Sequence, residues 1–161
     1  MPKIGITKVT VNPSLTVAGQ ADIRCATSAG AVSGGVITTL QAYVNARDGI
    51  VDLANVQSAN NQSVPAGGTA VVKASKAAAV KLAAAANWNA YIAGLPIGGN
   101  RSIGGVVALS ELEQAVMDAG AEDLTSPTLN GVAANYALTT IQVATVPTGL
   151  DTALTWLEVA G

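Results

Sequence analysis

Histidine is absent from the 161-residue sequence. Its absence removes the side chain that most often serves as a general base, orients a catalytic triad or binds a metal ion. Cys25 is the only cysteine, so one chain can form neither an internal disulfide nor a metal site of paired thiolates. We interpret Cys25 as a buried or half-buried structural thiol. The sequence therefore predicts no catalytic residue, no metal site and no cofactor, and we expect a protein that is not an enzyme.

Charged and aromatic residues are also scarce. Only 11% of the residues are charged and 3% are aromatic, with no phenylalanine, whereas 50% are hydrophobic. The core must therefore consist of valine, leucine, isoleucine and alanine, which bury less apolar area per residue than aromatic side chains do. A lobe with such a core has limited stability on its own, and a surface with so little charge suits docking against other subunits.

The placement of charge and of apolar residues argues against several classes of partner. The net charge is −2 and the basic residues are scattered, whereas binding to nucleic acid requires clustered lysine and arginine. The longest apolar run, Ala77 to Ala86, contains Lys81 and is far shorter than the roughly 18 residues of a membrane span. The opening segment MPKIGITK lacks the apolar part of a signal peptide. We expect no nucleic acid, membrane or small-molecule substrate as a partner, and synthesis in a cytoplasm.

Strands and one helix are predicted in the N-terminal part. Alternating apolar residues over 3–17, broken at Pro13, predict one bent edge strand or two short strands with the apolar face buried. The segment 21–35 is small and glycine-rich, so only strand fragments are expected there. Apolar residues at three- and four-residue spacing predict a helix from Val36 to Asp48-Gly49, and partial alternation follows over 50–56.

The segment 58–68, SANNQSVPAGG, is polar and contains proline and glycine. We interpret it as an exposed loop. It separates an N-terminal strand and helix lobe at 1–57 from a second lobe at 69–161. The fold class predicted from the whole pattern is α+β, in two small lobes with short antiparallel strands, a long alanine-rich helix and a short capped helix.

The alanine-rich helix is predicted over Thr69 to Ala93. Its many alanines give it high helix propensity and a thin profile, which permits close approach of a neighbouring helix or sheet. That neighbour is either another part of this chain or another subunit. Large aromatic side chains concentrate binding energy at interfaces, and core packing is the alternative role for them. The predicted interface residues are Leu82, Trp88, Tyr91 and Trp156.

Cap residues delimit the helices of the second lobe. Gly94 ends the long helix, and a glycine-rich connector follows it. The sequence Ser110-Glu111-Leu112-Glu113 fits a capping box, in which the serine oxygen accepts from an amide of the first turn and Glu113 reaches back to the amide of Ser110. Gly120 closes the short helix that begins there.

Strands are predicted in the remainder of the chain. A segment that starts at Leu124 is stopped by Ser126-Pro127. The pair Asn130-Gly131 favours a tight hairpin turn. Strands over 136–146 and 153–159 then form an antiparallel sheet at the end of the chain.

Two local patterns resemble ligand sites but lack essential groups. Gly99 to Gly104 has the spacing of a phosphate-binding loop, yet Gly105-Val106 stands where lysine and serine or threonine are required. We interpret it as a turn. Asp118, Glu122 and Asp123 form an acidic cluster, but calcium needs about six to eight oxygen ligands, and paired-carboxylate hydrolysis of sugars needs a suitable cleft. We interpret this cluster as ordinary surface charge.

The stretch from Thr69 to Val143 resembles a known family. An alanine-rich helix ending in AYIAGLPIGG, followed by VVALSELEQAV and AEDLTSP, is similar to the C-terminal region of the baseplate J-like wedge proteins of contractile bacteriophage tails and related injection machines. Its most specific part is the pairing of LPIGG with SELEQAV. The chain departs from the family pattern at Ala121-Glu122-Asp123 and in the connector Asn100 to Gly105.

This resemblance implies a virion structural protein that is made in the host bacterial cytoplasm and assembled into the tail baseplate. It implies that the partners are other copies of this chain and other tail and baseplate proteins, including tail-tube, sheath-initiating and neighbouring wedge subunits. The implied function is to hold the baseplate ring together and to pass a change of shape to the sheath.

Two other classes of function stay open. One is a different structural protein of a tail or capsid. The other is a small carbohydrate- or cell-surface-binding module, motivated by the strands rich in threonine and asparagine and by the loop predicted at 58–68. Glycan binding by a monomer would favour the module. Recovery in a particle, or in a ring-like oligomer with Trp88 buried between chains, would favour the wedge protein.

Overall fold

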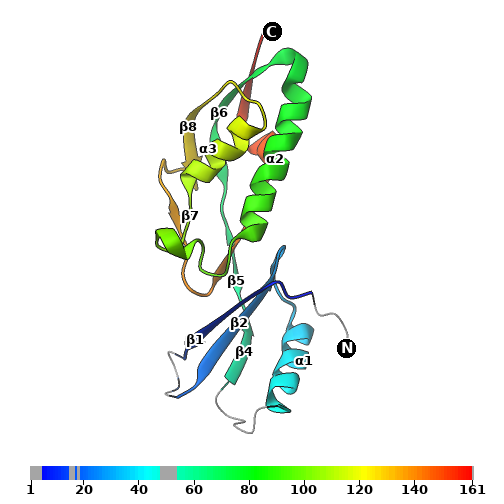
Figure 1. Cartoon of the computed structure of the whole chain (residues 1–161), viewed down its shortest axis with the longest axis vertical. Coiled ribbons are helices and arrows are strands. Elements are labelled where there is room, and N and C mark those ends of the chain that lie inside the picture. Colours follow the sequence, from blue (N-terminus) through cyan, green and yellow to red (C-terminus); the bar gives the residue numbers. More distant parts are fainter. Residues whose placement is uncertain (1–4, 15–16, 18, 48–53, 161) are drawn as a thin grey trace.

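The computed structural model describes residues 5–14, 17, 19–47 and 54–160. They form two lobes along one long axis, with the C-terminal end of the chain at the far end of the upper lobe (Figure 1). We call the lower one the N-terminal lobe and the upper one the C-terminal lobe. Helices and strands are both well represented. The predicted α+β fold in two small lobes is therefore confirmed.

The N-terminal lobe is a mixed sheet with one helix. Strand β2 (Ala21–Thr27) is antiparallel to β1 (Lys8–Pro13) and to the short β3 (Gly30–Ala31), and parallel to β4 (Ala54–Ser58). Parallel neighbours need a crossover connection, which α1 (Gly34–Asn45) provides between β2 and β4. Of the strand or strands predicted over 3–17, the structure has one, β1, which ends at Pro13, and residues 3–4 and 15–16 lie outside the described residues. The segment 21–35 is more regular than its small residues suggest.

Helix α1 forms where the apolar spacing predicts a helix. Val36, Leu40 and Val44 recur on one side and are half-buried, and α1 packs mainly on β4. No residue of α1 is fully buried. The predicted stop at Asp48-Gly49 and the start of the strand predicted at 50–56 lie outside the described residues.

The C-terminal lobe is built on a sheet of three strands in the order β11–β6–β8. Strand β6 (Ala66–Lys73) is antiparallel to β8 (Asp123–Leu129) but parallel to β11 (Thr155–Val159). The antiparallel sheet predicted at the end of the chain is therefore mixed. This pairing brings the last strand back to a strand near the middle of the sequence.

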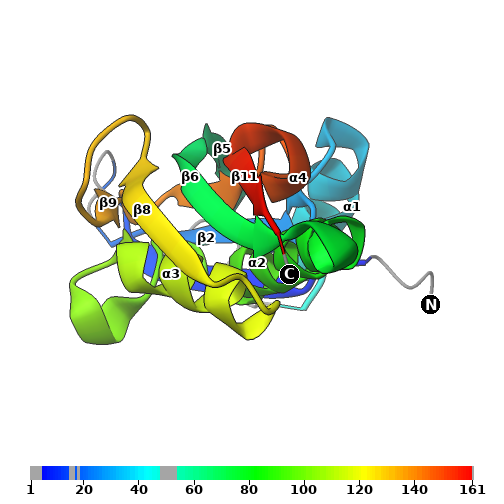
Figure 2. The same ribbon diagram turned by 90° about the horizontal axis from the view of Figure 1, so that it is seen from above.

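Helices α2 (Ala77–Gly94) and α3 (Leu109–Asp118) lie together on one face of this sheet (Figure 2). The short α4 (Leu150–Ala153) leads into β11 and contacts α2 and β6. The core between these elements consists mainly of valine, leucine and alanine, as predicted, and its largest member is Trp88.

The prediction of a helix from Thr69 was wrong for its first residues. Thr69 to Lys73 belong to β6, in which Ala70 and Val72 are completely buried. A single 3₁₀ turn, Ala74–Lys76, then leads into α2. Valine is β-branched and fits a sheet better than a helix, and pairing with strands on both sides fixes β6 in a way that alanine content does not reveal. The predicted helix end at Gly94 is confirmed.

The prediction of an exposed loop over 58–68 was also wrong. Asn60–Ser63 form β5, which pairs in parallel with β10 (Gln142–Thr145), and β6 begins at Ala66. Polar amide residues disfavour strands on their own, so a partner strand far away in the sequence decides the structure here. The chain passes from the N-terminal lobe to the C-terminal lobe along this segment (Figure 1).

Helix α3 begins without the predicted capping box. Its first residue is Leu109, and the N-cap residue Ala108 makes no side-chain cap bond. Two backbone amides at this end instead donate to distant side chains, Ala108 N to Tyr91 Oη at 3.0 Å and Leu109 N to Asn135 Oδ1 at 2.9 Å. Tertiary contacts therefore replace the local cap that the sequence predicts.

The other end of α3 follows the prediction. Gly120 has a φ of 98°, which favours glycine. The amides of Gly120 and Ala121 donate to the carbonyls of Met117 and Val116, the pattern of a Schellman motif.

Strand β8 continues through the predicted stop at Ser126-Pro127. Its register with β6 shifts between Gly67 and Thr69, and Ser126 has a φ of 50°, so a β-bulge accommodates the proline.

The turn predicted at Asn130-Gly131 is confirmed. Both residues have positive φ, 52° and 77°, and Leu129 and Val132 exchange two backbone hydrogen bonds across the turn. The strand predicted over 136–146 is divided into β9 (Tyr136–Ala137), which pairs with β7 (Val106–Val107), and β10.

Candidate functional site

Trp88 does not lie at the surface, so its prediction as an interface anchor was wrong. The side chain is 0% exposed and belongs to the core between α2, α3 and the sheet. Its ring centroid lies 5.4 Å from that of Tyr91, a separation favourable for aromatic pairs. Trp88 therefore stabilises the fold of one chain and is not available to a partner.

Tyr91 and Trp156 are half-buried and also have roles within the chain. The Tyr91 hydroxyl accepts from the amide at the start of α3, and burial raises the pKa of this phenol. Trp156 donates from Nε1 to the Leu150 carbonyl at 3.2 Å. Lys81 lies 6.0 Å from the Trp156 ring centre and pairs with Glu158 at 2.8 Å. Neither aromatic residue is a free anchor.

Leu82 is the predicted interface residue that the structure leaves accessible. It is 72% exposed on α2, and the side chains around it on the same side of the helix are alanines, with Asn89 two turns further along. We call this surface the outer face of α2; its residues are Ala78, Ala79, Leu82, Ala86 and Ala90, all exposed.

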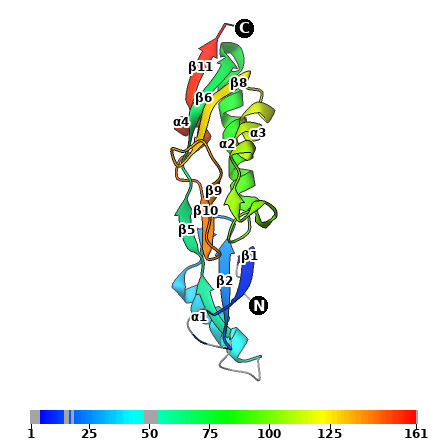
Figure 3. The same ribbon diagram turned by 90° about the vertical axis from the view of Figure 1, so that its left-hand side faces the viewer.

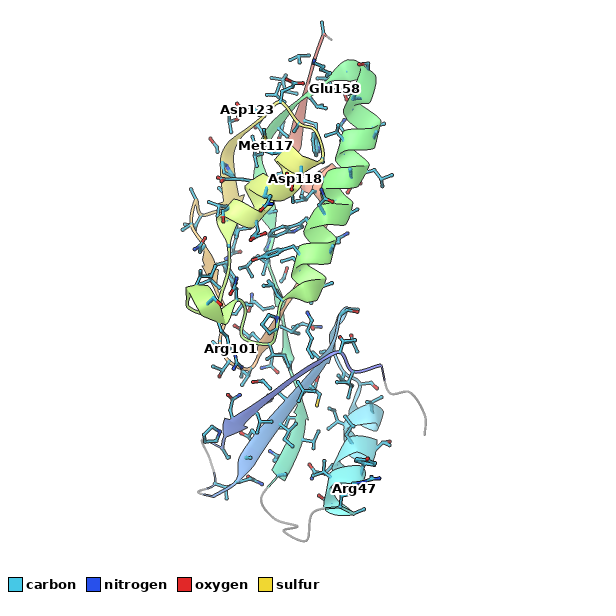
Figure 4. All side chains as sticks on the ribbon, viewed as in Figure 1. Arg47, Arg101, Met117, Asp118, Asp123 and Glu158 are labelled. Atoms are coloured by element: carbon cyan, nitrogen blue, oxygen red, sulfur yellow. The ribbon has the colours of Figure 1, made fainter. Side chains whose placement is uncertain are left out.

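The lobes are joined by polar contacts that the sequence did not predict. Lys8 is only 7% exposed, and its Nζ donates to the Ile92 carbonyl at 3.3 Å, near the C-terminal end of α2. That end of a helix carries free carbonyls and partial negative charge. Arg101, which Figure 4 shows where the lobes meet, donates from Nη2 to Thr10 Oγ1 at 2.6 Å.

The alternation in β1 is real, but the opposite face from the predicted one is buried. Lys8 and Thr10 turn toward the C-terminal lobe and are each 7% exposed, whereas Val9 and Val11 are 59% and 61% exposed. The alternation of Lys8, Thr10 and Asn12 with valine was the available signal. Hydrophobicity alone assigned the wrong face, because the second lobe covers the polar one.

A groove of about 540 Å³ lies beside these contacts. Asp22 accepts from Asn55 Nδ2 at 3.1 Å, and Arg24 donates from Nη1 to the Ser58 carbonyl at 3.2 Å. The lining can hydrogen-bond a polar group, and these residues include no nucleophile paired with a general base. The lining residues are Asn12, Pro13, Asp22, Arg24, Gln57, Thr140 and Ile141.

No protein-family model and no curated protein matched this sequence.

The acidic cluster lies on the C-terminal lobe, and Figure 4 labels two of its members, Asp118 and Asp123. Glu122 pairs with Lys73 at 3.6 Å across exposed side chains. Within the described ranges, no group of three or more cysteine, aspartate or glutamate residues is placed to hold a metal ion. None of the helices in the described part of the chain has the length and apolar character of a membrane span.

The connector predicted as a turn packs against backbone. Asn100–Gly105 contains a short 3₁₀ helix, Arg101–Ile103, and Asn100 Oδ1 accepts from Ser102 N at 3.1 Å. Gly99 has a φ of 73°, and a side chain there would lie 2.9 Å from backbone atoms of Gly105 and Val106. Glycine is therefore required for close backbone approach here, and the connector holds Arg101 against the N-terminal lobe.

Proposed function

We propose that this chain is a structural component of a bacteriophage or phage-like tail baseplate, of the J-like wedge kind. It assembles through protein–protein contacts with copies of itself and with other tail and baseplate proteins. The pairing of LPIGG with SELEQAV supports the family. A different virion structural protein is the alternative.

The observation that carries an assembly role is the outer face of α2. An 18-residue helix is about 27 Å long, and Lys81 is its only charged residue. Lys81 is paired with Glu158 within the chain, so the outer face has no unpaired charge and is mainly apolar. Apart from Lys81, Asn87 and Asn89, the side chains of α2 are apolar or aromatic, and this chain covers only one side of the helix, so apolar surface stays exposed on the other. A neighbouring subunit would bury the other side.

The location of the chain in a particle tests this proposal. An antibody against the chain, with gold labelling and electron microscopy, would be applied to tail particles from the bacterium that carries the gene. We expect label at the distal end of the tail, where the baseplate lies. Label on the capsid would support the alternative structural protein instead, and particles without label would contradict both.

Replacement of Leu82 by glutamate tests the docking face. Glutamate has good helix propensity and Leu82 is exposed, so the melting temperature should change little. Incorporation into particles should fall at least tenfold, because a charge would be buried without a partner. Val132→Glu is the matched control, since Val132 is 59% exposed on a distant hairpin. Equal incorporation of both variants would contradict a docking role for the outer face of α2.

A further inference from the structure

The sheet of the N-terminal lobe has two edges, formed by β1 on one side and by β4 with the short β3 on the other, and β4 is closed by a side chain. Outer strands expose unpaired backbone groups that can pair with another chain. On β4 these groups are occupied by Gln41 of α1, whose Nε2 donates to the Ala54 carbonyl at 2.9 Å and whose Oε1 accepts from Val56 N at 2.7 Å. The amide of Gln41 thus takes the place of a neighbouring strand.

At the other edge, no side chain among the described residues closes β1 in this way. Proteins commonly protect an outer strand with an outward lysine, a proline or a bulge. Lys8 turns inward to the Ile92 carbonyl, and Pro13 stands only at the end of the strand. Figure 3 shows β1 at the outer side of the N-terminal lobe. By contrast, β8 in the other lobe is interrupted by its bulge at Ser126-Pro127.

The apolar face of the sheet continues onto β1 without cover. In the register of the sheet, Val11 lies beside Ile23, which lies beside Val56. Helix α1 packs on the β4 side, so Val56 is 5% exposed while Val11 is 61% exposed. An added strand with apolar residues on that face would extend both the hydrogen bonding and the apolar layer.

We infer that the occupant of this edge is β1 of a second copy of the chain, paired antiparallel about Thr10. The sequence Val9-Thr10-Val11 is symmetric about its centre, so Val9 would lie opposite Val11 of the partner subunit, and Thr10 opposite Thr10 of the partner subunit. Cross-strand pairs of β-branched residues stabilise antiparallel pairing. A twofold axis makes the contact self-complementary and closes both edges. The result is one sheet that runs through two N-terminal lobes.

Self-association of the purified chain tests this inference separately from the baseplate proposal, because no particle is needed. Sedimentation velocity would be measured from roughly 1 μM to 1 mM protein, the range of weak interfaces. We expect a reversible dimer that Val11→Lys weakens at least tenfold, since an outward lysine opposes edge pairing. Val132→Lys is the control, because Val132 is an apolar residue of the other lobe and is 59% exposed, and it should leave the dimer unchanged. A monomer at every concentration, or equal effects of the two variants, would overturn the inference.

Disulfide trapping tests the register. In a Cys25→Ala background, a mixture of Val9→Cys and Val11→Cys chains places the two thiols directly opposite each other, about 4.5–5.5 Å apart at Cβ. Either variant alone places equal positions on the diagonal, about 7–8 Å apart, which is too far for a disulfide. We expect crosslinked dimer mainly in the mixture. Equal crosslinking by Val11→Cys alone would contradict the pairing about Thr10.

Discussion

The two lobes differ in how much core each has of its own. Helix α2 buries six residues, Ala77, Val80, Ala84, Ala85, Trp88 and Ile92, whereas α1 buries none. In the N-terminal lobe, Cys25 and Val56 are buried under α1's side of the sheet, but Ala26 and Ala59 are buried in a separate cluster with Ile97 and Val143 of the other lobe. A small sheet with one loosely packed helix is marginally stable. The N-terminal lobe therefore depends on its contact with the C-terminal lobe.

The largest expected effect is in the core of the C-terminal lobe. Trp88→Ala should destabilise the protein by about 3–5 kcal/mol, because it leaves a large cavity in a closely packed core. Chemical denaturation measured by circular dichroism would give the free energy of unfolding. Trp88→Phe should cost less, since it keeps most of the ring and removes a buried Nε1 that has no hydrogen-bond partner. A loss of assembly by Trp88→Ala with full stability would restore the original interface role.

A matched pair of smaller substitutions compares the lobes directly. Val72→Ala and Val56→Ala remove the same atoms from buried positions, 0% and 5% exposed, in different lobes. Each substitution should lower the free energy of unfolding by about 2 kcal/mol. Hydrogen exchange should then differ, because lobes of unequal stability open separately. Val56→Ala should accelerate exchange in β2 and β4 only, whereas Val72→Ala should accelerate it throughout. Faster exchange in α2 of the Val56→Ala variant would mean that the lobes unfold as one unit.

The smallest effect concerns the ammonium group between the lobes. Burial lowers the pKa of Lys8, so the folded state binds this proton less tightly than the unfolded state does. Stability should therefore rise as the pH increases through the folded-state pKa toward about 10.5. Because Cys25 and Tyr91 have raised pKa values and act in the opposite direction, wild type must be compared with Lys8→Met. The unfolding free energy of the wild type minus that of Lys8→Met should increase at alkaline pH. A difference independent of pH would contradict burial of the charged amine.

The sequence predicted the features that depend on local chemistry. The spacing of Val36, Leu40 and Val44 located α1, and Gly94, Gly120 and Asn130-Gly131 located two helix ends and a turn. Gly120, Asn130 and Gly131 have positive φ, which glycine and asparagine tolerate almost regardless of what surrounds them. Gly94 is the last residue of α2 and does not depend on positive φ. The α+β class followed from these elements.

The predictions that failed concern features that depend on partners far away in the sequence. Asn60–Ser63 is a strand because β10 lies beside it, and Thr69 is in a strand because β8 and β11 enclose β6. The predicted capping box did not form because α3 begins earlier, at Leu109, where the amides of Ala108 and Leu109 donate to Tyr91 and Asn135. A large aromatic side chain suits an interface as well as a core, so the sequence could not decide the role of Trp88. Only the packing of α3 on α2 decides between the two.

Strands β4, β5 and β6 follow one another along the long axis of the molecule (Figure 1), and β10 runs parallel to β5. A force that pulled the two lobes apart would therefore act lengthwise on β5. The hydrogen bonds between β5 and β10 lie across that direction, so they would resist in shear and share the load instead of opening one after another. The polar segment that cannot form a strand by itself is thus a tether between the lobes that pulling would load in shear.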